Sequence, residues 1–529
     1  MKKEWKAKLG EYAFLIVTAV ILFALVLFCI LKPDNLMHSD TTAEVILSKL
    51  LADENRLITK DWFYSTEIRI VYSHLLMMPL FKIFDSYRLV KFLSVFLFYL
   101  LMLVAFWFVS GRFELKKQWR FLGLALFFTP LSNEYLDMMF IGCFYSSQAI
   151  CTYLVLGIAA GWFAQRTKGR RRDMASLLFT HLFALVLGLS GLRYLASLFL
   201  PLCLALFWLL FTEEKDLFRE ALLKNNCFKM LIRTGTLLVC AGAGFLINKF
   251  YLARHYSFDT TTVTFVELSD VPERFLTSIR LMPEFFGYYP VEAVSGRGIV
   301  NAVKLLLLGF FVFALVYLVR VRREKLSRLQ RLLLYYFIAV FLLNWYLLVF
   351  TNVLMQYRYW IPVYLIAVIL VAVFFQVFTP PIAWQKGFYA VCVALAVLSS
   401  LYGELWQDAK YNDCEKRYGY MAFLEQQDYT FGYATFWNAS VTQYLSNGTI
   451  EVGNLGGENG VAAPYEWLCK KDLYREGYHT GKTFLLLART EEAGMLKGDF
   501  TVMPDGVKVY EDEYYAIYEG QGMYLFSEP

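Results

Sequence analysis

The sequence predicts a polytopic α-helical membrane protein with about eleven transmembrane helices and a C-terminal mixed α/β domain. Two observations predict this class. The 529 residues are 58% hydrophobic and 18% charged, whereas a soluble globular chain is about half apolar and about a quarter charged. The apolar residues also come in long blocks, and about 17–25 such residues span a bilayer.

Eleven apolar runs are long enough to be considered as spans. They begin near Tyr12, Tyr87, Trp119, Ser147, Ser176, Leu192, Thr234, Asn301, Leu332, Trp360 and Gly387. The first run follows a basic N-terminus and is longer than the core of a cleaved signal peptide. We therefore expect an uncleaved first transmembrane helix.

The basic residues predict the orientation of these helices. They cluster within the segments 2–8, 112–120, 166–172, 215–233 and 320–331, which all fall on one side if every run spans once. Lys and Arg favour the cytoplasmic side. We expect a multi-pass plasma-membrane protein with a cytoplasmic N-terminus, and with the segments 32–85, 131–146, 252–300 and everything after Tyr402 outside the cytoplasm.

The predicted domain boundary follows the last apolar run. Residues 1–402 form the transmembrane domain, and residues 403–529 form an extracytoplasmic α/β domain. Within the latter, FGYATFWNASVTQYLSNGTIEVGN predicts a strand, a short helix, a turn at Asn447-Gly448 and a strand. From Gly403 onward the chain has ten Lys/Arg and twenty Asp/Glu, which gives a net charge of −10, and the total of +6 then leaves +16 for the remainder. Because the basic residues lie in short loops between apolar runs, they indicate topology, and no nucleic-acid partner is expected.

The outer loop 32–85 holds the densest group of acidic residues in the apolar part of the chain. Read as a helix, HSDTTAEVILSKLLAD places apolar side chains on one face and Asp40, Glu44 and Ser48 on the other. We expect this amphipathic helix to lie flat on the bilayer with its acids in water. A second interfacial helix is predicted within DWFYSTEIRIVYSHLLMMPLFKIF, with Asp61 and Glu67 near its start.

These features resemble the GT-C membrane glycosyltransferases, near the branch of the protein O-mannosyltransferases and the lipid A aminoarabinose transferase. The residues that carry the resemblance are Asp40 within HSDTTAE and Asp61-Trp62 through Glu67. The likeness covers about the first 110 residues, and beyond them it is topological to about residue 380. The family commonly has Glu directly after the Asp, whereas Thr41 follows Asp40 here.

The resemblance implies transfer of a sugar from a polyprenyl-phosphate donor to an acceptor on the outer face of the membrane. Asp40 is the candidate catalytic base that takes the proton from the acceptor hydroxyl. Glu44, Asp61 and Glu67 are candidate substrate-binding residues. Cations must hold the leaving phosphate, and the candidates at predicted outer helix ends are Arg193 and Arg358, each next to a tyrosine, Tyr194 and Tyr359.

Each of these residues also has a structural interpretation. Asp40 would serve only as a helix N-cap, Glu44 would lie on a solvated face, and the two arginines would only reach toward lipid headgroups. His38 and His74 beside Asp40 lack a second close ligand, so no metal site is predicted, and a divalent cation stays open as a cofactor. The sugar and the acceptor, a polymer, a lipid or a protein, are not encoded in any recognisable motif.

Two other functions compete with glycosyl transfer. A transporter or a flippase for a lipid-linked saccharide is the main alternative, but such proteins usually carry ionisable residues near the middle of the membrane, and the centres of these runs are nearly free of charge. A membrane-anchored binding protein ranks last, because eleven helices are far more than an anchor requires.

Overall fold

The computed structural model describes residues 2–164, 170–213, 225–258, 263–380, 382, 384–407, 413–458, 461–495 and 502–527. The chain divides into two compact units. Unit 1 comprises residues 1–31, 98–247 and 262–410, and unit 2 comprises residues 32–97, 248–261 and 411–529. This division differs from the predicted boundary at residues 402–403, because the segment 32–97 belongs to the same unit as the C-terminal segment.

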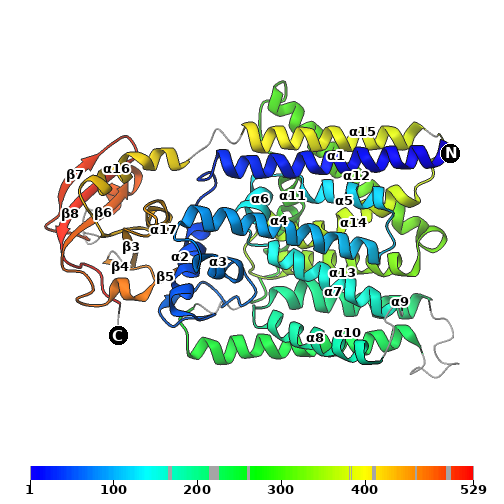
Figure 1. Cartoon of the computed structure of the whole chain (residues 1–529), viewed down its shortest axis with the longest axis horizontal. Coiled ribbons are helices and arrows are strands. Elements are labelled where there is room, and N and C mark those ends of the chain that lie inside the picture. The colour runs from blue at the N-terminus through cyan, green and yellow to red at the C-terminus, as the bar shows by residue number, and fades with distance from the viewer. Residues whose placement is uncertain are drawn as a thin grey trace. The chain divides into compact units, whose positions relative to one another are not determined.

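Unit 1 is helical. Its principal elements are α1 (Lys2–Leu31), the greater part of α4 (Tyr87–Arg112), α5 (Lys117–Phe128), α7 (Ser146–Phe163), α8 (Arg170–Gly188), α9 (Leu200–Glu213), α10 (Asn226–Leu246), α11 (Val271–Phe285), α12 (Gly296–Lys325), α13 (Arg328–Phe350), α14 (Ile361–Val377) and α15 (Trp384–Leu401). Shorter helical turns lie between them: α6 (Asn133–Leu136), η1 (Asp137–Ile141), η2 (Leu195–Phe199), η6 (Tyr357–Trp360) and η7 (Tyr402–Gln407). Figure 1 shows these helices running side by side.

The predicted apolar runs all form helices. Among the described residues, nine helices are long and apolar enough to cross a membrane. The runs near Trp119 and Ser176 form α5, with 12 residues, and α8, whose apolar part is Met174–Gly188. The prediction of a polytopic helical membrane protein is confirmed. Five of the basic residues used to predict orientation lie outside the described residues: Arg166, Lys168, Lys215, Arg219 and Lys224.

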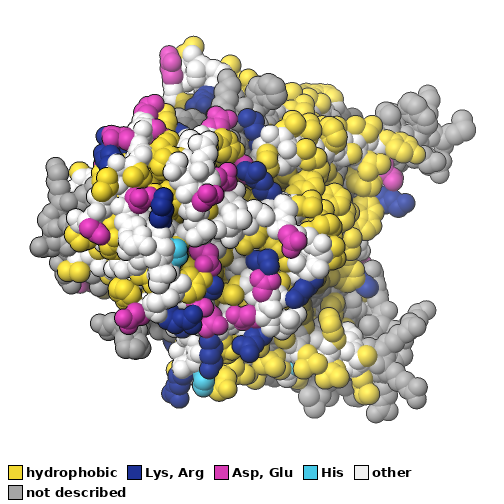
Figure 2. Space-filling model, turned by 60° about the vertical axis from the view of Figure 1, so that its left-hand side comes forward, with side chains coloured by type: hydrophobic (Ala, Val, Ile, Leu, Met, Phe, Trp, Pro, Cys, Tyr) yellow, Lys and Arg dark blue, Asp and Glu magenta, His cyan; other side chains and the backbone are white. Residues whose placement is uncertain are grey.

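The surface and the interior of unit 1 suit a bilayer. Large apolar side chains such as Phe211, Val239 and Val316 are exposed on its helices, and Figure 2 shows broad areas of hydrophobic side chains on the face that it draws. Small residues allow close helix contacts: a Cβ added at Gly188 of α8 would lie 1.9 Å from the Ala241 carbonyl oxygen, and one at Gly244 of α10 would lie 2.1 Å from the Leu185 oxygen. Such contacts between small residues are typical of helix packing in membranes.

Unit 2 combines helices with sheets. Its elements from the first segment are α2 (Ser39–Glu54), β1 (Trp62–Phe63), α3 (His74–Phe81) and the first turns of α4; the residues 248–254 form the helical turns η4 (Ile247–Tyr251) and η5 (Leu252–Arg254). Its C-terminal segment forms η9 (Asp413–Arg417), α16 (Tyr418–Gln426), β2 (Phe431–Thr435), α17 (Phe436–Leu445), β3 (Glu451–Glu458), β4 (Val461–Pro464), β5 (Cys469–Lys470), η10 (Lys471–Tyr474), β6 (Lys482–Ala488), α18 (Arg489–Met495), β7 (Val507–Glu511) and β8 (Tyr515–Gln521).

The C-terminal segment confirms the predicted mixed α/β domain. Six strands form one sheet in the order β4-β3-β2-β6-β8-β7. β2 pairs in parallel with β3 and with β6, and the other pairs are antiparallel. β2, α17 and β3 reproduce the strand, helix, turn and strand that the sequence predicts, with Asn447 and Gly448 in left-handed conformations at the turn. Fully buried aromatic and aliphatic side chains, among them Tyr433, Phe484 and Leu486, cover both faces.

The predicted surface orientation of α2 is wrong. The helix occurs where it is expected, but side chains on both of its faces are buried, and it packs against α3 and α17. Its polar face can be buried because small hydroxyl groups are satisfied along the helix itself. Thr42 donates to the His38 carbonyl oxygen at 3.1 Å, and Ser48 donates to the Glu44 carbonyl oxygen at 2.6 Å.

The second predicted interfacial helix is correct only in its last part. Trp62 and Phe63 form a strand that pairs antiparallel with β5, with Trp62 opposite Lys470 and Phe63 opposite Cys469. The helix α3 begins only at His74. The aromatic residues suit a strand, but the partner strand lies about four hundred residues later in the chain, so the local sequence pattern does not reveal the pairing.

Candidate functional site

Glu44, in the second turn of α2, is the central residue of a group of acidic side chains in unit 2. Its side chain is buried, and its Oε2 accepts a hydrogen bond from the Ser73 hydroxyl at 3.3 Å. Burial is the main cause that raises the pKa of Glu44 to about 7. Arg69, the Ser73 hydrogen bond and Lys91 act in the opposite direction, and Asp40 adds to the rise. A carboxyl group with this pKa exchanges protons readily at neutral pH.

Asp40 lies one helical turn before Glu44, in the first turn of α2. It is half-exposed and its charge acts on Glu44. The N-cap position is held by His38, whose side chain makes no capping hydrogen bond. The interpretation of Asp40 as an N-cap is therefore wrong, although a carboxylate in the first turn still interacts favourably with the helix dipole. The predicted solvated position of Glu44 is also wrong, because its side chain is 7% exposed and bonds to Ser73 at the start of α3.

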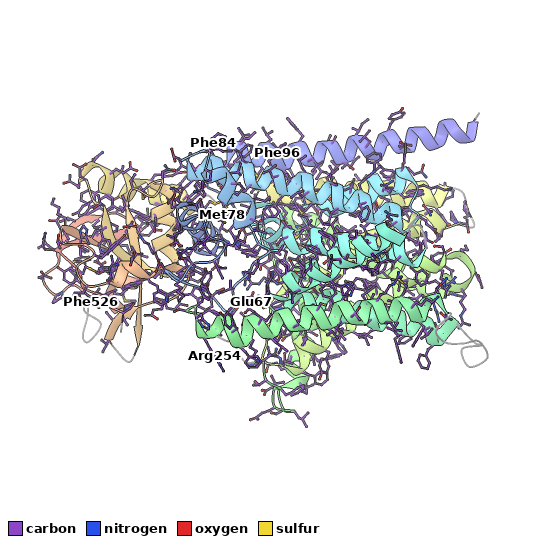
Figure 3. The ribbon with its side chains drawn as sticks, turned by 60° about the horizontal axis from the view of Figure 1, so that its bottom comes forward. Glu67, Met78, Phe84, Phe96, Arg254 and Phe526 are labelled. Atoms are coloured by element: carbon purple, nitrogen blue, oxygen red, sulfur yellow. The ribbon has the colours of Figure 1, made fainter. Side chains whose placement is uncertain are left out.

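A small cavity lined by both polar and apolar side chains adjoins Glu44. It has a volume of about 20 Å³, and its lining includes Glu44, Tyr64, Glu67, Arg69 and His74. A cavity of this size holds about one water molecule. Figure 3 labels Glu67 on the segment between β1 and α3. Thus two of the predicted substrate-binding residues, Glu44 and Glu67, do line one cavity.

Arg69 supplies a cation to this cavity. Its Nε lies 3.4 Å from Glu67 Oε1, and its Nη1 donates to the Tyr72 hydroxyl at 3.0 Å. Burial disfavours the charge of Arg69, but Tyr72, Glu67 and Glu44 outweigh this effect and raise its pKa. The guanidinium therefore stays charged, and it faces acids that it only partly neutralises.

His74 contributes a neutral imidazole. Burial lowers its pKa to about 4, although a hydrogen bond to the Ile70 carbonyl oxygen opposes the shift. Its Nε2 is buried and has no hydrogen-bond partner among the described residues. A buried nitrogen beside a cavity large enough for one water indicates a place for a solvent molecule or a ligand atom.

Asp61 lies apart from this cavity lining. Its side chain is exposed, its amide donates to the Thr59 hydroxyl at 3.1 Å, and its carbonyl oxygen accepts from the Lys471 amide at 3.1 Å. The role of Asp61 in the structure is therefore to flank the short sheet of β1 and β5. Among the described residues, no group of three His, Cys, Asp or Glu is arranged to hold a metal ion.

The sequence analysis missed two groups that contact or influence Glu44. Ser73 carries no sequence signal. Lys91 is buried near the start of α4 and lowers the pKa of Glu44. The sequence does contain a signal for Lys91, namely a lysine in the first turns of an apolar run. A buried amine requires a nearby acid, so this signal could have indicated a contact with an acidic residue.

The predicted phosphate-binding arginines belong to unit 1. Arg193 donates through Nη1 to the Phe144 carbonyl oxygen at 3.2 Å, and its guanidinium lies 4.3 Å from the centre of the Tyr145 ring. Arg358, in η6, places Nη1 3.7 Å from Glu134 Oε1. Both arginines therefore contact the link 131–146, which contains α6 and η1. The sequence alone places these two arginines more than 160 residues apart in the chain, and does not reveal this common partner.

The two neighbouring tyrosines differ. Tyr194 is buried and its hydroxyl interacts with the side chains of Ser147 and Cys151, which is a packing role. Tyr359 is half-buried beside Arg358. Tyr357, on the other side of Arg358, hydrogen-bonds to Glu134 and Tyr289. Of the two tyrosines in QYRYW, Tyr357 is therefore the one that shares the partner Glu134 with Arg358.

A buried ion pair in unit 1 was also missed. Lys304 of α12 is paired with Glu404 of η7, and their side chains are 4% and 1% exposed. The Lys304 ammonium also donates to the Gly287 carbonyl oxygen at 3.3 Å. The side chain of Asn301 donates to the Tyr289 carbonyl oxygen at 2.5 Å. These bonds fix the loop at residues 287–289 onto α12.

No protein-family model and no curated protein sequence matches the chain. Among solved structures, the fold is similar to that of ArnT from Cupriavidus metallidurans, whose crystal structure contains undecaprenyl phosphate. The TM-score is 0.57 at 12% sequence identity, and the match covers 96% of this chain and 97% of that chain. The predicted architecture, a multi-pass helical domain with a C-terminal α/β segment, is therefore confirmed, and this chain is similar in fold to ArnT along nearly its whole length.

Proposed function

We propose that the protein is a membrane glycosyltransferase that moves a sugar from a polyprenyl-phosphate donor to an acceptor at the outer face of the membrane. The observation that carries the proposal is the fold match, over nearly the whole of both chains, to ArnT bound to undecaprenyl phosphate. Undecaprenyl phosphate is a polyprenyl phosphate, and it is what remains of such a donor after its sugar has left. The outer location rests on the distribution of basic residues in the sequence.

Asp40 is the proposed catalytic base. A base must reach the acceptor hydroxyl, and Asp40 is half-exposed at the start of α2 whereas Glu44 is enclosed. As the acceptor oxygen attacks the anomeric carbon, Asp40 takes its proton, and the bond from that carbon to the phosphate oxygen breaks. The anomeric configuration is inverted in this single displacement.

Glu44 and Glu67 are proposed to position the reacting groups from the cavity beside Asp40. With a pKa of about 7, Glu44 carries a proton about half of the time at neutral pH. When Glu44 is protonated, it no longer places a second negative charge one helical turn from Asp40. The cavity has room for about one water, and a hydroxyl group of the sugar or acceptor can take the place of that water. Asp61 has no assigned part in this scheme.

Arg193 and Arg358 are proposed to bind the phosphate. Arginine presents a planar fork of donors that suits phosphate oxygens. The contact of Arg358 with Glu134, at 3.7 Å, is longer than a hydrogen bond, so a phosphate oxygen can compete for this guanidinium. The described residues offer no metal-binding group, and no step of the proposal uses the divalent cation that the sequence left open.

The proposal is tested with the full-length protein in liposomes, a labelled polyprenyl-phosphate sugar and a cell-envelope extract as acceptor source. The Asp40→Asn variant is expected to lower the rate of polyprenyl-phosphate release by about 10² to 10⁴-fold, the usual contribution of a general base. The matched control is Asp53→Asn on the same helix, whose side chain is 58% exposed. This control is expected to keep the wild-type rate.

Three outcomes would count against the scheme. Equal rates for wild type and Asp40→Asn would remove Asp40 as the base. Equal losses in Asp40→Asn and Asp53→Asn would show a general effect on α2. If the wild-type protein releases no polyprenyl phosphate but moves the labelled lipid from one leaflet to the other, the flippase alternative is correct and the transferase proposal is wrong.

A further inference from the structure

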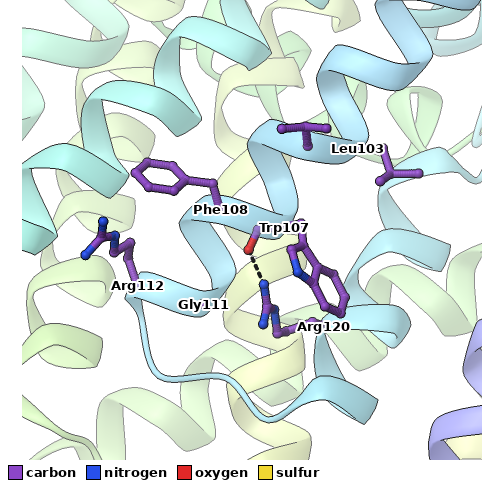
Figure 4. A pocket seen from close by; sticks show the side chains of 7 residues that line it. Leu103, Trp107, Phe108, Gly111, Arg112 and Arg120 are labelled. Carbon is purple, nitrogen blue, oxygen red and sulfur yellow. Dashed lines mark hydrogen bonds between the residues drawn. The ribbon is translucent and has the colours of Figure 1, made fainter.

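A second cavity lies in unit 1, at the C-terminal end of α4. Its volume is about 520 Å³, and seven residues line it: Leu103, Val104, Trp107, Phe108, Gly111, Arg112 and Arg120. Two of these residues are arginines, and the other five are uncharged. Figure 4 shows the two guanidinium groups at the end of α4, on either side of Gly111, with the Phe108 and Trp107 rings beside them.

Each arginine is held against an aromatic ring. The guanidinium of Arg112 lies 5.0 Å from the centre of the Phe108 ring, and that of Arg120 lies 3.6 Å from the centre of the Trp107 ring. Such cation–π contacts orient a guanidinium without using its in-plane N–H donors. The aromatic rings therefore position the two cations and leave donors for an anion.

Arg120 is further fixed by two hydrogen bonds. Its Nε donates to the Ser110 hydroxyl at 3.3 Å, and one Nη donates to the Trp107 carbonyl oxygen. These bonds use two of its five N–H donors. Arg120 packs closely over Gly111, since a Cβ at this position would lie 3.1 Å from Arg120 Nη2. A C-terminal helix end also favours cations.

The wall of the cavity nearer the middle of α4 is apolar. Val104 is 62% exposed and Leu103 is half-buried, and both belong to a helix that is apolar enough to span a membrane. The cavity thus joins two cations at a helix end to an apolar surface that faces acyl chains. This pairing fits a molecule with an anionic head and a hydrocarbon tail.

We propose that this cavity binds the phosphate headgroup of an anionic phospholipid. The phosphate accepts hydrogen bonds from Arg112 and Arg120, and the first part of an acyl chain lies along Leu103 and Val104. The site is separate from the residues proposed for glycosyl transfer, and it takes its ligand from the leaflet beside the 112–117 turn. Bulk lipid supplies such a ligand continuously, so the bound lipid would be a structural component of the membrane-embedded protein.

The test uses the purified full-length protein in detergent, with dioleoyl phosphatidylglycerol as probe and native mass spectrometry as readout. Wild type is expected to bind this lipid more tightly than dioleoyl phosphatidylcholine. The double variant Arg112→Gln/Arg120→Gln is expected to bind phosphatidylglycerol about tenfold more weakly, which corresponds to about 1.4 kcal/mol. The single variant Arg112→Gln tests the same point without removing the hydrogen bonds of Arg120, and its expected loss is smaller.

A charge-matched control is Arg320→Gln/Arg323→Gln on α12, because both side chains are exposed. This control is expected to retain wild-type binding. Equal binding by wild type and Arg112→Gln/Arg120→Gln, or an equal loss in the control, would overturn the proposal. Competition by inorganic phosphate as effective as that by phosphatidylglycerol would overturn the lipid assignment, because it would show a site for free phosphate.

Discussion

Two buried carboxylates, Glu404 in unit 1 and Glu44 in unit 2, have different surroundings although both are almost excluded from solvent. Glu404 faces Lys304 directly, and the same ammonium group reaches the Gly287 carbonyl oxygen. The Glu44 side chain accepts a hydrogen bond from the Ser73 hydroxyl, and the guanidinium of Arg69, which lines the same cavity, is paired with Glu67.

The two carboxylates differ in how far nearby cations compensate for their loss of contact with water. A buried ion pair in direct contact compensates much of the desolvation of both groups, and such a pair holds two helices and a loop together. Glu44 is compensated only in part, so burial dominates and its pKa rises to about 7. Burial thus has different consequences for the two carboxylates, because the cation of Glu404 is in direct contact and the Arg69 guanidinium beside Glu44 is paired with Glu67.

The largest expected effect is on the buried ion pair of Lys304 and Glu404. Lys304→Met leaves Glu404 buried without its cation, and we expect the free energy of unfolding to fall by about 3–5 kcal/mol. Lys304→Met/Glu404→Leu removes both charges and is expected to recover most of that loss. Unfolding in detergent followed by circular dichroism measures both. A double variant no more stable than the single one would show that the pair is not the source of the loss.

The second effect is on Glu44 and depends on pH. The folded pKa of about 7 lies above the ordinary value of 4.5, so between these values the folded state binds more protons than the unfolded state. The contribution of Glu44 to stability should therefore be largest below about pH 4.5 and fall by about 3 kcal/mol as the pH rises through about 7, after which it levels off. Unfolding measured across this range tests the expectation.

Glu44→Gln is expected to remove that fall, because the amide does not titrate. Asp53→Asn, on the exposed side of the same helix, should keep the wild-type dependence. If the unfolding free energy of Glu44→Gln falls with pH as it does in the wild type, Glu44 is not the source of the fall. Glu44 and Glu404 would then not differ in the way proposed.

A smaller effect is expected where the loop 287–289 meets α12. Gly287 has φ +81°, and a Cβ there would lie 2.2 Å from the Leu131 carbonyl oxygen and 2.5 Å from Lys304 Nζ. Gly287→Ala should cost at least about 1–2 kcal/mol in unfolding free energy from the backbone conformation alone. Gly309→Ala on α12 is the control, since a Cβ there meets no atom within 4 Å, and it should be neutral or stabilising.

The smallest effect concerns the arginines. Arg358→Lys keeps the charge but loses the planar fork, and we expect the KM for the polyprenyl-phosphate donor to rise about tenfold with less change in kcat. Arg280→Lys is the control, because that side chain is 76% exposed and pairs only with Glu284. An unchanged KM would assign Arg358 to its contact with Glu134 and not to the donor.

The sequence predicted what depends on local patterns. Apolar runs predicted the helices, and the segment with its turn at Asn447-Gly448 predicted the strand, helix and strand of the C-terminal segment. The errors involve contacts between distant residues. Nothing near Ser39 shows that it bonds to α17, and nothing near Trp62 shows that Lys470 is opposite it in a strand.

The candidate site was predictable to the same extent. Asp40 and Glu44 were found from helical spacing, but the burial that distinguishes them arises from residues distant in the sequence, among them Ser73 and Leu468. Arg193 and Arg358 were chosen for their places at helix ends, and their common contact with the link 131–146 appears only in three dimensions. Lys304 and Glu404 each read as an isolated charge near the end of an apolar run, because their pairing joins positions 100 residues apart.

The short sheet of β1 and β5 has a consequence for biogenesis. β1 lies next to the cavity-lining segment, and its partner β5 is followed by only the last part of the chain; Leu468 itself lines the cavity beside Glu44. During synthesis, α2 and β1 emerge early and must wait until residues 468–470 have been translated and delivered to the same side of the membrane. The nascent protein therefore lacks a complete carboxylate cavity until residues 468–470 have been translated.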